Sequence, residues 1–288
     1  MPTIDAHLHV FDAVSDRFPR DVFEPLTPPD RSAPAEALLA DMERAGVDRA
    51  VVVAVSHHDE YLKHVLATYP TRFAGVSVSA PDALDPVADL YRRVETLGIQ
   101  GLRVFTLGDP GAQPESQPLF PLLTAMAQLG VKLWFYAEVA QVVLLDGILD
   151  LLPDLVVVMN HLGFCPSIWD EMRVDEHGRP RFDVALPPSS LDTVVGLARH
   201  PNVYVHMSGQ YAFSQTSYPY PDLRPVVEQV YRSFGAGRMM WASDYPWIEH
   251  APGYVETLEL VDHHLPEITV DERLAIRGGT AAGLFRFG

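Results

Sequence analysis

Basic side chains, cysteine and long apolar runs are all scarce in this sequence of 288 residues. It has 21 Lys and Arg against 38 Asp and Glu, which gives a formal net charge of −17. Nucleic acids and acidic membrane surfaces bind clustered cations, so we expect neither as a partner. The single cysteine, Cys165, excludes an intramolecular disulfide. No apolar run reaches the length of a membrane span.

The first ten residues lack the pattern of an export signal. They carry no basic cluster followed by an apolar run, and Asp5, His7 and His9 interrupt the apolar residues that are present. We therefore expect no signal peptide and a cytoplasmic location, which the single cysteine also fits.

Short β-branched segments alternate with amphipathic helical segments along the whole chain. At three junctions, a helical segment ends at a glycine and a strand follows almost at once, at Gly46, Gly98 and Gly130. Glycine accepts the left-handed backbone that closes a helix. One of these helices is expected to begin with Asp85 as its N-cap and Pro86 in its first turn. The predicted strands lie at 3–9, 49–55, 73–79, 101–105, 132–136, 155–160, 203–207 and 239–243.

An unbroken alternation of strand and helix predicts a parallel sheet with right-handed crossovers. Eight such units in about 250 residues are typical of a closed (β/α)8 TIM barrel, which we expect to form one domain over residues 1–288. An open, doubly wound α/β sheet is the alternative. That fold normally has a glycine-rich phosphate loop after its first strand, where this chain has His7-Leu8-His9.

Three of the expected loops are longer than usual βα connections. They cover 11–34, 164–190 and 209–222, after strands one, six and seven. The carboxyl ends of barrel strands form the catalytic face, so we expect these loops to wall a substrate pocket. The tail at 271–287 predicts a short extra helix that closes the barrel.

Four residues that can carry chemistry fall at predicted strand ends. His7 and His9 lie two residues apart, so both side chains should face the barrel interior. His161 and Asp244 follow the apolar runs 155–159 and 239–243 and should emerge at the same end. Hydrogen-bonded core histidines explain an arbitrary His-x-His about equally well. An aspartate that meets three imidazoles is harder to explain structurally, because buried charge is costly unless it is paired or metal-bound. We predict that these four residues form a reaction centre.

Four motifs in this order resemble the amidohydrolase-related superfamily. They are Ile4-Asp5-Ala6-His7-Leu8-His9, Asn160-His161-Leu162-Gly163, Met207-Ser208-Gly209 and Ala242-Ser243-Asp244-Tyr245-Pro246-Trp247. The chain is most similar to the lactonase-like branch, which includes pyrone-dicarboxylate and sugar-lactone hydrolases. The resemblance implies a barrel, hydrolysis at a carbonyl centre, and a first-strand histidine pair that works with the last-strand aspartate.

The sequence departs from the metal-dependent members of this superfamily at its middle strands. Those members usually place a further His or a bridging Lys there, where this chain has Arg103-Val104-Phe105 and Tyr136-Ala137-Glu138. A two-metal centre is therefore not expected. His7, His9 and Asp244 are enough to hold one Zn²⁺ or Mn²⁺, with Glu138 as a candidate fourth ligand. The resemblance also allows these residues to act with no metal, the imidazoles polarising the carbonyl directly; one divalent ion is slightly preferred.

Five further residues are candidates for substrate binding. Arg103 can hold a carboxylate by two parallel hydrogen bonds, although a surface salt bridge would explain it nearly as well. His206 alternates with Ser208 and is expected behind the reacting groups or against the substrate. Tyr136, Tyr211 and Trp247 are expected to offer flat aromatic surfaces and polar donors to a substrate ring. The alternative is that they only pack against the protein.

The resulting hypothesis is a hydrolase of a lactone, or of a related cyclic ester or amide, from a small carboxylated or sugar-derived molecule. Asp244 would act as the general base for water, and the imidazoles would stabilise the oxyanion. A non-oxidative decarboxylase of an unsaturated or aromatic acid is the enzymatic alternative. A catalytically silent ligand-binding barrel is the other. The expected partner is a small molecule, and both a monomer and a homo-oligomer stay open.

Overall fold

Eight parallel strands form one sheet in the order β1-β2-β3-β4-β5-β6-β9-β10. The computed structural model describes all of residues 1–288. Two backbone hydrogen bonds close the ring: Asp244 N donates to His7 O at 3.0 Å, and His9 N donates to Tyr245 O at 2.7 Å. The predicted (β/α)8 barrel is confirmed. Its strands are β1 (Ile4–Leu8), β2 (Arg49–Val53), β3 (Phe73–Val78), β4 (Gly101–Val104), β5 (Lys132–Phe135), β6 (Val157–Met159), β9 (Val203–Met207) and β10 (Met239–Trp241).

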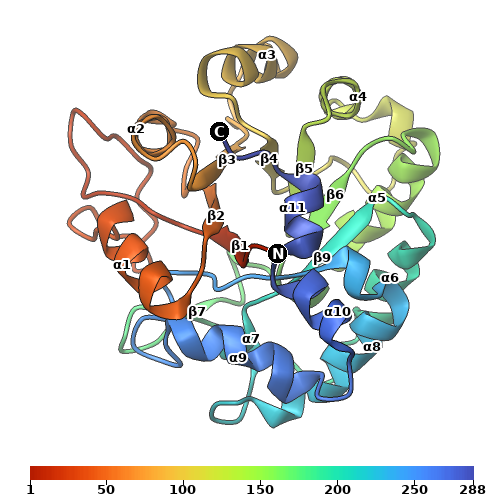
Figure 1. Cartoon of the computed structure of the whole chain (residues 1–288). Helices are drawn as coiled ribbons and strands as arrows, with labels where there is room; N and C mark the ends of the chain where they lie inside the picture. The colour runs from red at the N-terminus through yellow and green to blue at the C-terminus, as the bar shows by residue number, and fades with distance from the viewer.

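Helices surround the ring of strands (Figure 1). They end and begin as the sequence predicts: Gly46, Gly98 and Gly130 have positive φ values, and Asp85 Oδ1 accepts a hydrogen bond from Ala88 N at 2.9 Å. None combines the length and the apolar sequence that a membrane crossing requires. The helices are α1 (Ala35–Ala45), α2 (Glu60–Thr68), α3 (Pro86–Leu97), α4 (Phe120–Leu129), α5 (Val139–Leu151), α6 (Leu191–Gly196), α7 (Gln210–Phe213), α8 (Arg224–Phe234), α9 (Tyr254–His264), α10 (Val270–Leu274) and α11 (Thr280–Leu284).

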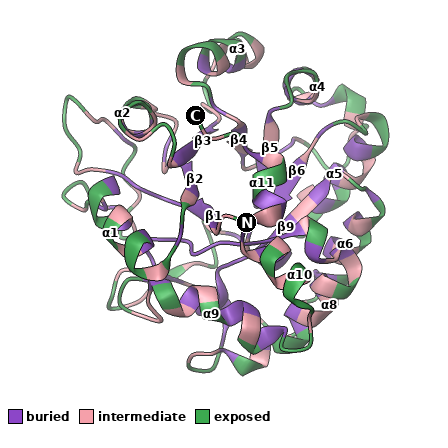
Figure 2. Ribbon diagram, viewed as in Figure 1, coloured by how far each residue is buried: buried purple, intermediate pink, exposed green.

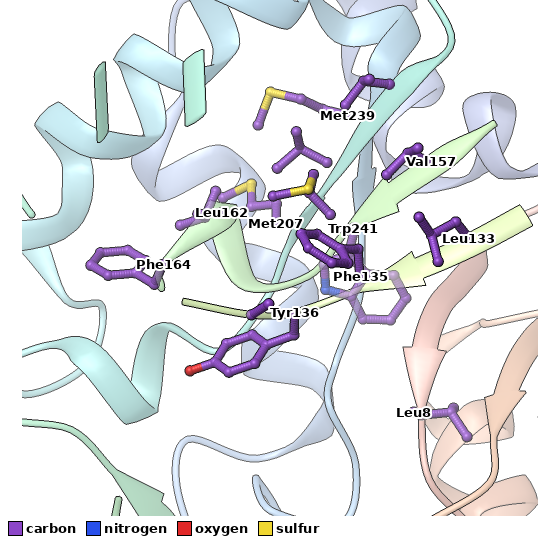
Figure 3. Close-up of a cluster of buried hydrophobic side chains, with 14 of the residues drawn as sticks. Leu8, Leu133, Phe135, Tyr136, Val157, Leu162, Phe164, Met207, Met239 and Trp241 are labelled. Carbon is purple, nitrogen blue, oxygen red and sulfur yellow. The ribbon is translucent and has the colours of Figure 1, made fainter. Parts of the chain in front are cut away.

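The larger part of the core lies between the strands and the helices. Outward-facing strand residues such as Leu133, Phe135 and Val157 pack there, and Figure 3 shows part of this layer. Burial follows the same plan, because the strands are buried while the helices expose their outer faces (Figure 2). The alternation of strand side chains thus leaves every second residue for the barrel interior.

A smaller apolar cluster fills the amino-terminal end of the barrel interior. Val51, Val76, Val158 and Met240 contribute to it from four strands. Phe285, just after α11, packs edge to face on Trp134 with ring centroids 5.8 Å apart, so the chain end plugs this end of the barrel. The tail contains α10, a π-helical turn at Ala275–Gly279, and α11, in the region where a closing helix was expected. Polar chemistry is therefore left to the opposite end.

The replacement Phe285→Ala should remove this plug. Phe285 is buried, so its loss should lower the free energy of unfolding by about 3–5 kcal/mol, as for other buried Phe→Ala changes. Denaturant titration would measure it. Phe287→Ala is the matched control, since Phe287 is only partly buried against the same cluster and should cost less. Equal losses in the two variants would contradict the plugging role.

Candidate functional site

The four predicted centre residues meet at the carboxyl-terminal end of the barrel. His7 Nε2 lies 3.4 Å from Asp244 Oδ1, and His9 Nε2 lies 3.8 Å from the same atom. The His7 ring is 4.9 Å from the His9 ring and 5.4 Å from the His161 ring between centroids. Three imidazoles, from β1 and the residue after it and from the end of β6, thus gather around the carboxylate that follows β10.

An irregularity in β1 turns His7 into the barrel. Asp5 pairs with Ala50 and Leu8 with Val52, so β1 has one more residue than β2 between these two pairs. Such a bulge re-aims side chains next to it. Asp5, which strict alternation would put on the same face as His7, instead accepts hydrogen bonds from Ser243 N and from the hydroxyl of Tyr254 in α9, both at 2.9 Å.

Asp5 thereby ties β1 to the segment that carries Asp244. Its Oδ1 accepts from the backbone of Ser243, the residue before Asp244, and also from His7 N at 3.3 Å. Burial raises the pKa of Asp5 to about 6, against the effect of these hydrogen bonds. One buried carboxyl group therefore binds the backbone of both segments that close the barrel, at His7 and at Ser243.

Two of the centre residues have left-handed backbone conformations. His161 has a φ of 51° and Asp244 a φ of 63°. Such values cost about 1 kcal/mol each for a residue with a Cβ, although Asp tolerates them better than most. These conformations direct both side chains from the strand ends into the barrel mouth. Strained backbone of this kind is concentrated at functional sites.

Gly209 makes room for His161. Its φ is +74°, and a Cβ at this position would lie 2.8 Å from His161 Nδ1. The adjacent Ser208 places its Oγ 3.0 Å from the same nitrogen. The Met207-Ser208-Gly209 motif therefore packs closely on the imidazole ring and offers it a hydrogen bond.

Trp134 of β5 determines which nitrogen of His7 carries the proton. Its indole Nε1 donates to His7 Nδ1 at 2.7 Å. An indole N–H can only donate, so Nδ1 must accept, and the neutral ring then carries its proton on Nε2. That N–H is buried, has no hydrogen-bond partner and lies 3.4 Å from Asp244 Oδ1. His7 thus presents a proton to the aspartate.

The other members of the centre are oriented in different ways. His9 Nδ1 lies 2.9 Å from the carbonyl oxygen of Val53, to which it must donate, so the neutral ring keeps a lone pair on Nε2. Tyr211 donates its hydroxyl to Asp244 Oδ2 at 2.6 Å. Asp244 Oδ1 accepts no hydrogen bond from any residue and is the oxygen available for chemistry.

Burial keeps the imidazoles of the centre uncharged near neutral pH. It lowers the pKa of His9 and of His161 to about 4, partly opposed by the charge of Asp244. It also lowers the pKa of His7 and of His206 well below the usual value. A neutral imidazole can accept or donate one proton, which is what general acid–base chemistry requires.

A cavity of about 690 Å³ opens above this centre. His9, His161 and Asp244 lie on its wall, whereas His7 lies behind them. Walls are contributed by the segments after β1, β6 and β9, the same regions where long loops were expected. The volume suits a small organic molecule.

Four of the five predicted substrate-binding residues line this cavity: Arg103, Tyr136, Tyr211 and Trp247. The hydroxyl of Tyr136, whose ring Figure 3 shows, donates to Pro166 O at 3.0 Å and that of Tyr211 to Asp244, so both hydroxyls already have acceptors. Arg103 forms no salt bridge or hydrogen bond, which is against the interpretation as a surface ion pair.

Two predicted residues lie elsewhere. His206 is fully buried beneath His7, with its Nδ1 3.3 Å from Asn160 Oδ1, and does not line the cavity. Glu138 is exposed at the N-cap of α5 and does not join the centre. β5 ends at Phe135, so strand alternation does not continue to Glu138, and the predicted fourth metal ligand lies outside the group of possible ligands.

The donor set fits a single divalent ion only in part. Ligand atoms of His7, His161 and Asp244 lie within 4.8 Å of one another, a spacing that three ligands of one ion can have. In the orientation that Trp134 imposes, however, His7 Nε2 carries a proton and has no lone pair for a metal. His161 and Asp244 can still offer lone pairs to an ion; His9 Nε2 also keeps one, 3.8 Å from Asp244 Oδ1, but His9 is not part of this closely spaced group.

Residue types alone did not reveal the partners that orient this centre. Trp134, Ser208 and Asp5 act through contacts with residues far away in the chain. The only signal in the sequence was position: Trp134 lies on a strand, Ser208 directly follows the strand that ends at Met207, and Asp5 stands two residues before His7.

Comparison with known proteins gives consistent matches along the chain. A family profile described as amidohydrolase matches residues 4–287. A curated relative, 4-sulfomuconolactone hydrolase of Rhizobium radiobacter, is 23% identical over 94% of this chain and 86% of its own.

Two solved structures share the barrel over nearly their whole length. One, from Pseudomonas putida, is described as a 2-pyrone-4,6-dicarboxylic acid hydrolase and has a TM-score of 0.73 and 24% identity, with 98% of this chain and 97% of that one covered. The other is an amidohydrolase from Burkholderia multivorans with bound zinc, with a TM-score of 0.73, 18% identity and full coverage of both chains. At these identities the likeness shows a common fold.

The replacement Trp134→Phe should change the affinity for zinc. Loss of the indole N–H frees His7 Nδ1 to carry the proton, so that Nε2 gains a lone pair. We expect zinc to bind about 10-fold more tightly, a usual size for residues that orient ligands. Calorimetric titration of chelator-treated protein would measure it. Trp241→Phe is the control, because this buried indole donates to Thr257 O, outside the centre. An unchanged zinc affinity in Trp134→Phe would contradict the assignment.

The buried imidazoles should make the metal-free protein less stable in acid. The pKa of His9 and His161 is about 4 in the folded chain and near 6.5 when unfolded, so the unfolded chain binds more protons between these values. Stability should fall as the pH drops from about 6.5 to 4, by about 2 kcal/mol or more between pH 7 and 5. Asp5, with its raised pKa, opposes this in part.

Denaturant titration at several pH values would measure this dependence. His161→Gln should reduce the slope, and exchange of the exposed His250 for Gln should leave it unchanged. A stability that does not fall over this range would mean that the imidazoles are not held neutral by burial.

Proposed function

Because the chain belongs to the amidohydrolase family, we propose that it hydrolyses the ring ester of a small carboxylated lactone. The observation that carries the proposal is the position of Asp244 Oδ1. This oxygen accepts no hydrogen bond, faces two imidazoles at 3.4 and 3.8 Å and belongs to a residue on the cavity wall. The names of the relatives, a sulfomuconolactone hydrolase and a pyrone-dicarboxylic acid hydrolase, agree with a lactone as substrate class.

Water would be activated between Asp244 and His9. The hydroxyl of Tyr211 occupies Asp244 Oδ2, so Oδ1 is the oxygen that can take a proton. His9 Nε2 offers a second acceptor 3.8 Å from Oδ1, and a water that donates one proton to each would keep both lone pairs free for attack on a carbonyl carbon in the cavity. His7 Nε2–H, on the buried side of the carboxylate, would hold it in this orientation.

The lactone carbonyl would be polarised from the other side by His161. When Ser208 donates its hydroxyl to His161 Nδ1, the proton of the neutral ring is on Nε2 and points toward the cavity. This N–H stabilises the oxyanion that forms as water adds to the carbonyl carbon. Arg103, which has no protein partner, would hold the carboxylate substituent of the substrate.

Ring opening completes the reaction. The bond between the carbonyl carbon and the ring oxygen breaks, and the proton that Asp244 has taken returns to the leaving oxygen, so the product is a hydroxy acid. A divalent ion held by His161 and Asp244 would require the other His161 tautomer, in which Nδ1–H donates to Ser208 Oγ and Nε2 keeps its lone pair; the ion would then supply Lewis-acid polarisation of the carbonyl in place of the N–H. Zn²⁺ or Mn²⁺ suits such nitrogen and oxygen ligands.

The replacement Asp244→Asn tests the proposal directly. It keeps the size of the side chain and removes the proton acceptor, so kcat for a carboxylated lactone should fall about 10³-fold or more while the fold is kept. A pH-indicator assay of acid release and a thermal unfolding curve would measure both. Asp154→Asn, at an exposed carboxylate outside the cavity, should leave kcat unchanged. A well-folded Asp244→Asn enzyme with full activity would refute the role of Asp244.

A further inference from the structure

The cavity has only one cationic side chain on its wall. Of the 28 residues that line it, Arg103 is the one Lys or Arg. Its Nε atom is buried without a hydrogen-bond partner, and its guanidinium lies over the ring of Phe105 at 4.7 Å. Burial of such a cation without an acceptor is unfavourable unless a ligand supplies the missing anion.

Other arginines near the walls are already occupied by protein acceptors. Arg181 donates to Tyr211 O and Ser214 O. Arg31 donates to Leu26 O and Gly178 O. Each of the three histidines on the wall already has a protein partner: His9 Nδ1 donates to Val53 O, His161 Nδ1 lies 3.0 Å from Ser208 Oγ, and His57 Nδ1 lies 2.8 Å from Asp21 Oδ2. The cavity can therefore neutralise one anionic group of a ligand.

The remaining charges on the wall are negative. Asp244 is at the base, and Asp21 is at the rim, where its Oδ2 lies 2.8 Å from His57 Nδ1. A second anionic group on a ligand would find no further Lys or Arg on the wall, and at the base or at this part of the rim it would face a carboxylate. Such a like-charge contact disfavours a dianionic molecule.

The outer part of the cavity is apolar instead. Phe23, from the segment after β1, faces Trp169, from the segment after β6, and Val22 lines the same cavity. The Phe23 and Trp169 rings pack edge to face with centroids 5.2 Å apart, yet Trp169 stays 65% exposed. An exposed indole at the mouth of a cavity, next to Val22 at 46% exposure, leaves apolar area that a ligand can cover.

We propose that the substrate is a lactone with a single carboxylate and an apolar alkyl or aryl substituent. The carboxylate would pair with Arg103, and the substituent would lie against Phe23 and Trp169. This inference rests on the proposed lactone hydrolysis and adds the substrate class. It separates this chain from the relatives whose names state a second acidic group, the sulfo group of sulfomuconolactone and the second carboxyl of pyrone-dicarboxylic acid.

A matched pair of lactones tests it. The first is a five-membered lactone with one carboxylate and a benzyl substituent; the second carries a carboxymethyl group in place of the benzyl group. We expect kcat/KM to be about 10-fold or more higher for the benzyl lactone, the usual range for such a change in an apolar site. The Trp169→Ala enzyme should lose most of this preference. Tyr91→Ala, which removes an exposed aromatic ring of α3 outside the cavity, should retain it.

Binding of unreactive analogues separates this inference from the proposed reaction. The two cyclic ethers that lack the ring carbonyl cannot be hydrolysed, and calorimetry can compare their affinities. Tighter binding of the benzyl ether, lost in Trp169→Ala, supports the substrate class even if neither lactone is hydrolysed; absence of hydrolysis then counts against the proposed reaction alone. Equal or tighter binding of the dianionic ether, or an unchanged preference in Trp169→Ala, overturns the inference.

Discussion

The site depends on the contact between the first and last strands of the barrel. Asp244 N donates to His7 O and His9 N donates to Tyr245 O, so the hydrogen bonds that close the barrel are made by the residues of the proposed reaction centre and by Tyr245. Asp5 strengthens the same contact through Ser243 N and Tyr254. Any shift of one strand against the other would separate the imidazole pair from its aspartate. The same hydrogen bonds therefore support both the stability of the barrel and the geometry of the proposed centre.

Single hydrogen bonds give chemically identical imidazoles different roles. Trp134 makes His7 a donor, the carbonyl of Val53 makes His9 an acceptor, and Ser208 can make His161 a donor toward the cavity. Burial keeps His9 and His161 neutral, so these roles are stable at neutral pH. Preorganisation of this kind lets a centre act without reorganising during the reaction. It also limits metal binding, because a protonated His7 Nε2 cannot coordinate an ion.

The proposed selectivity for a monoanionic lactone rests on the scarcity of basic side chains in the cavity. The fold agrees with that of the named hydrolase structure, and Arg103 is the single Lys or Arg on the cavity wall. Loops after β1 and β6 contribute Phe23 and Trp169 rather than further cations. In a barrel the strands hold the reacting groups and the loops decide what is bound, so a common centre can serve different lactones.

The sequence by itself determined the eight strands, the helix ends and the rim to which His7, His9, His161 and Asp244 belong. These features depend on hydrophobic periodicity and on helix-end residues such as Gly46 and Asp85, whose effects are local in the chain. Tertiary structure alone decided the rest. The bulge that separates Asp5 from His7, the exposure of Glu138 after a strand that ends early, and the lack of a partner for Arg103 could not be read from spacing. The proton position on His7 is set by Trp134, 127 residues away, because a hydrogen bond requires its partner's atoms in space and not its place in the chain.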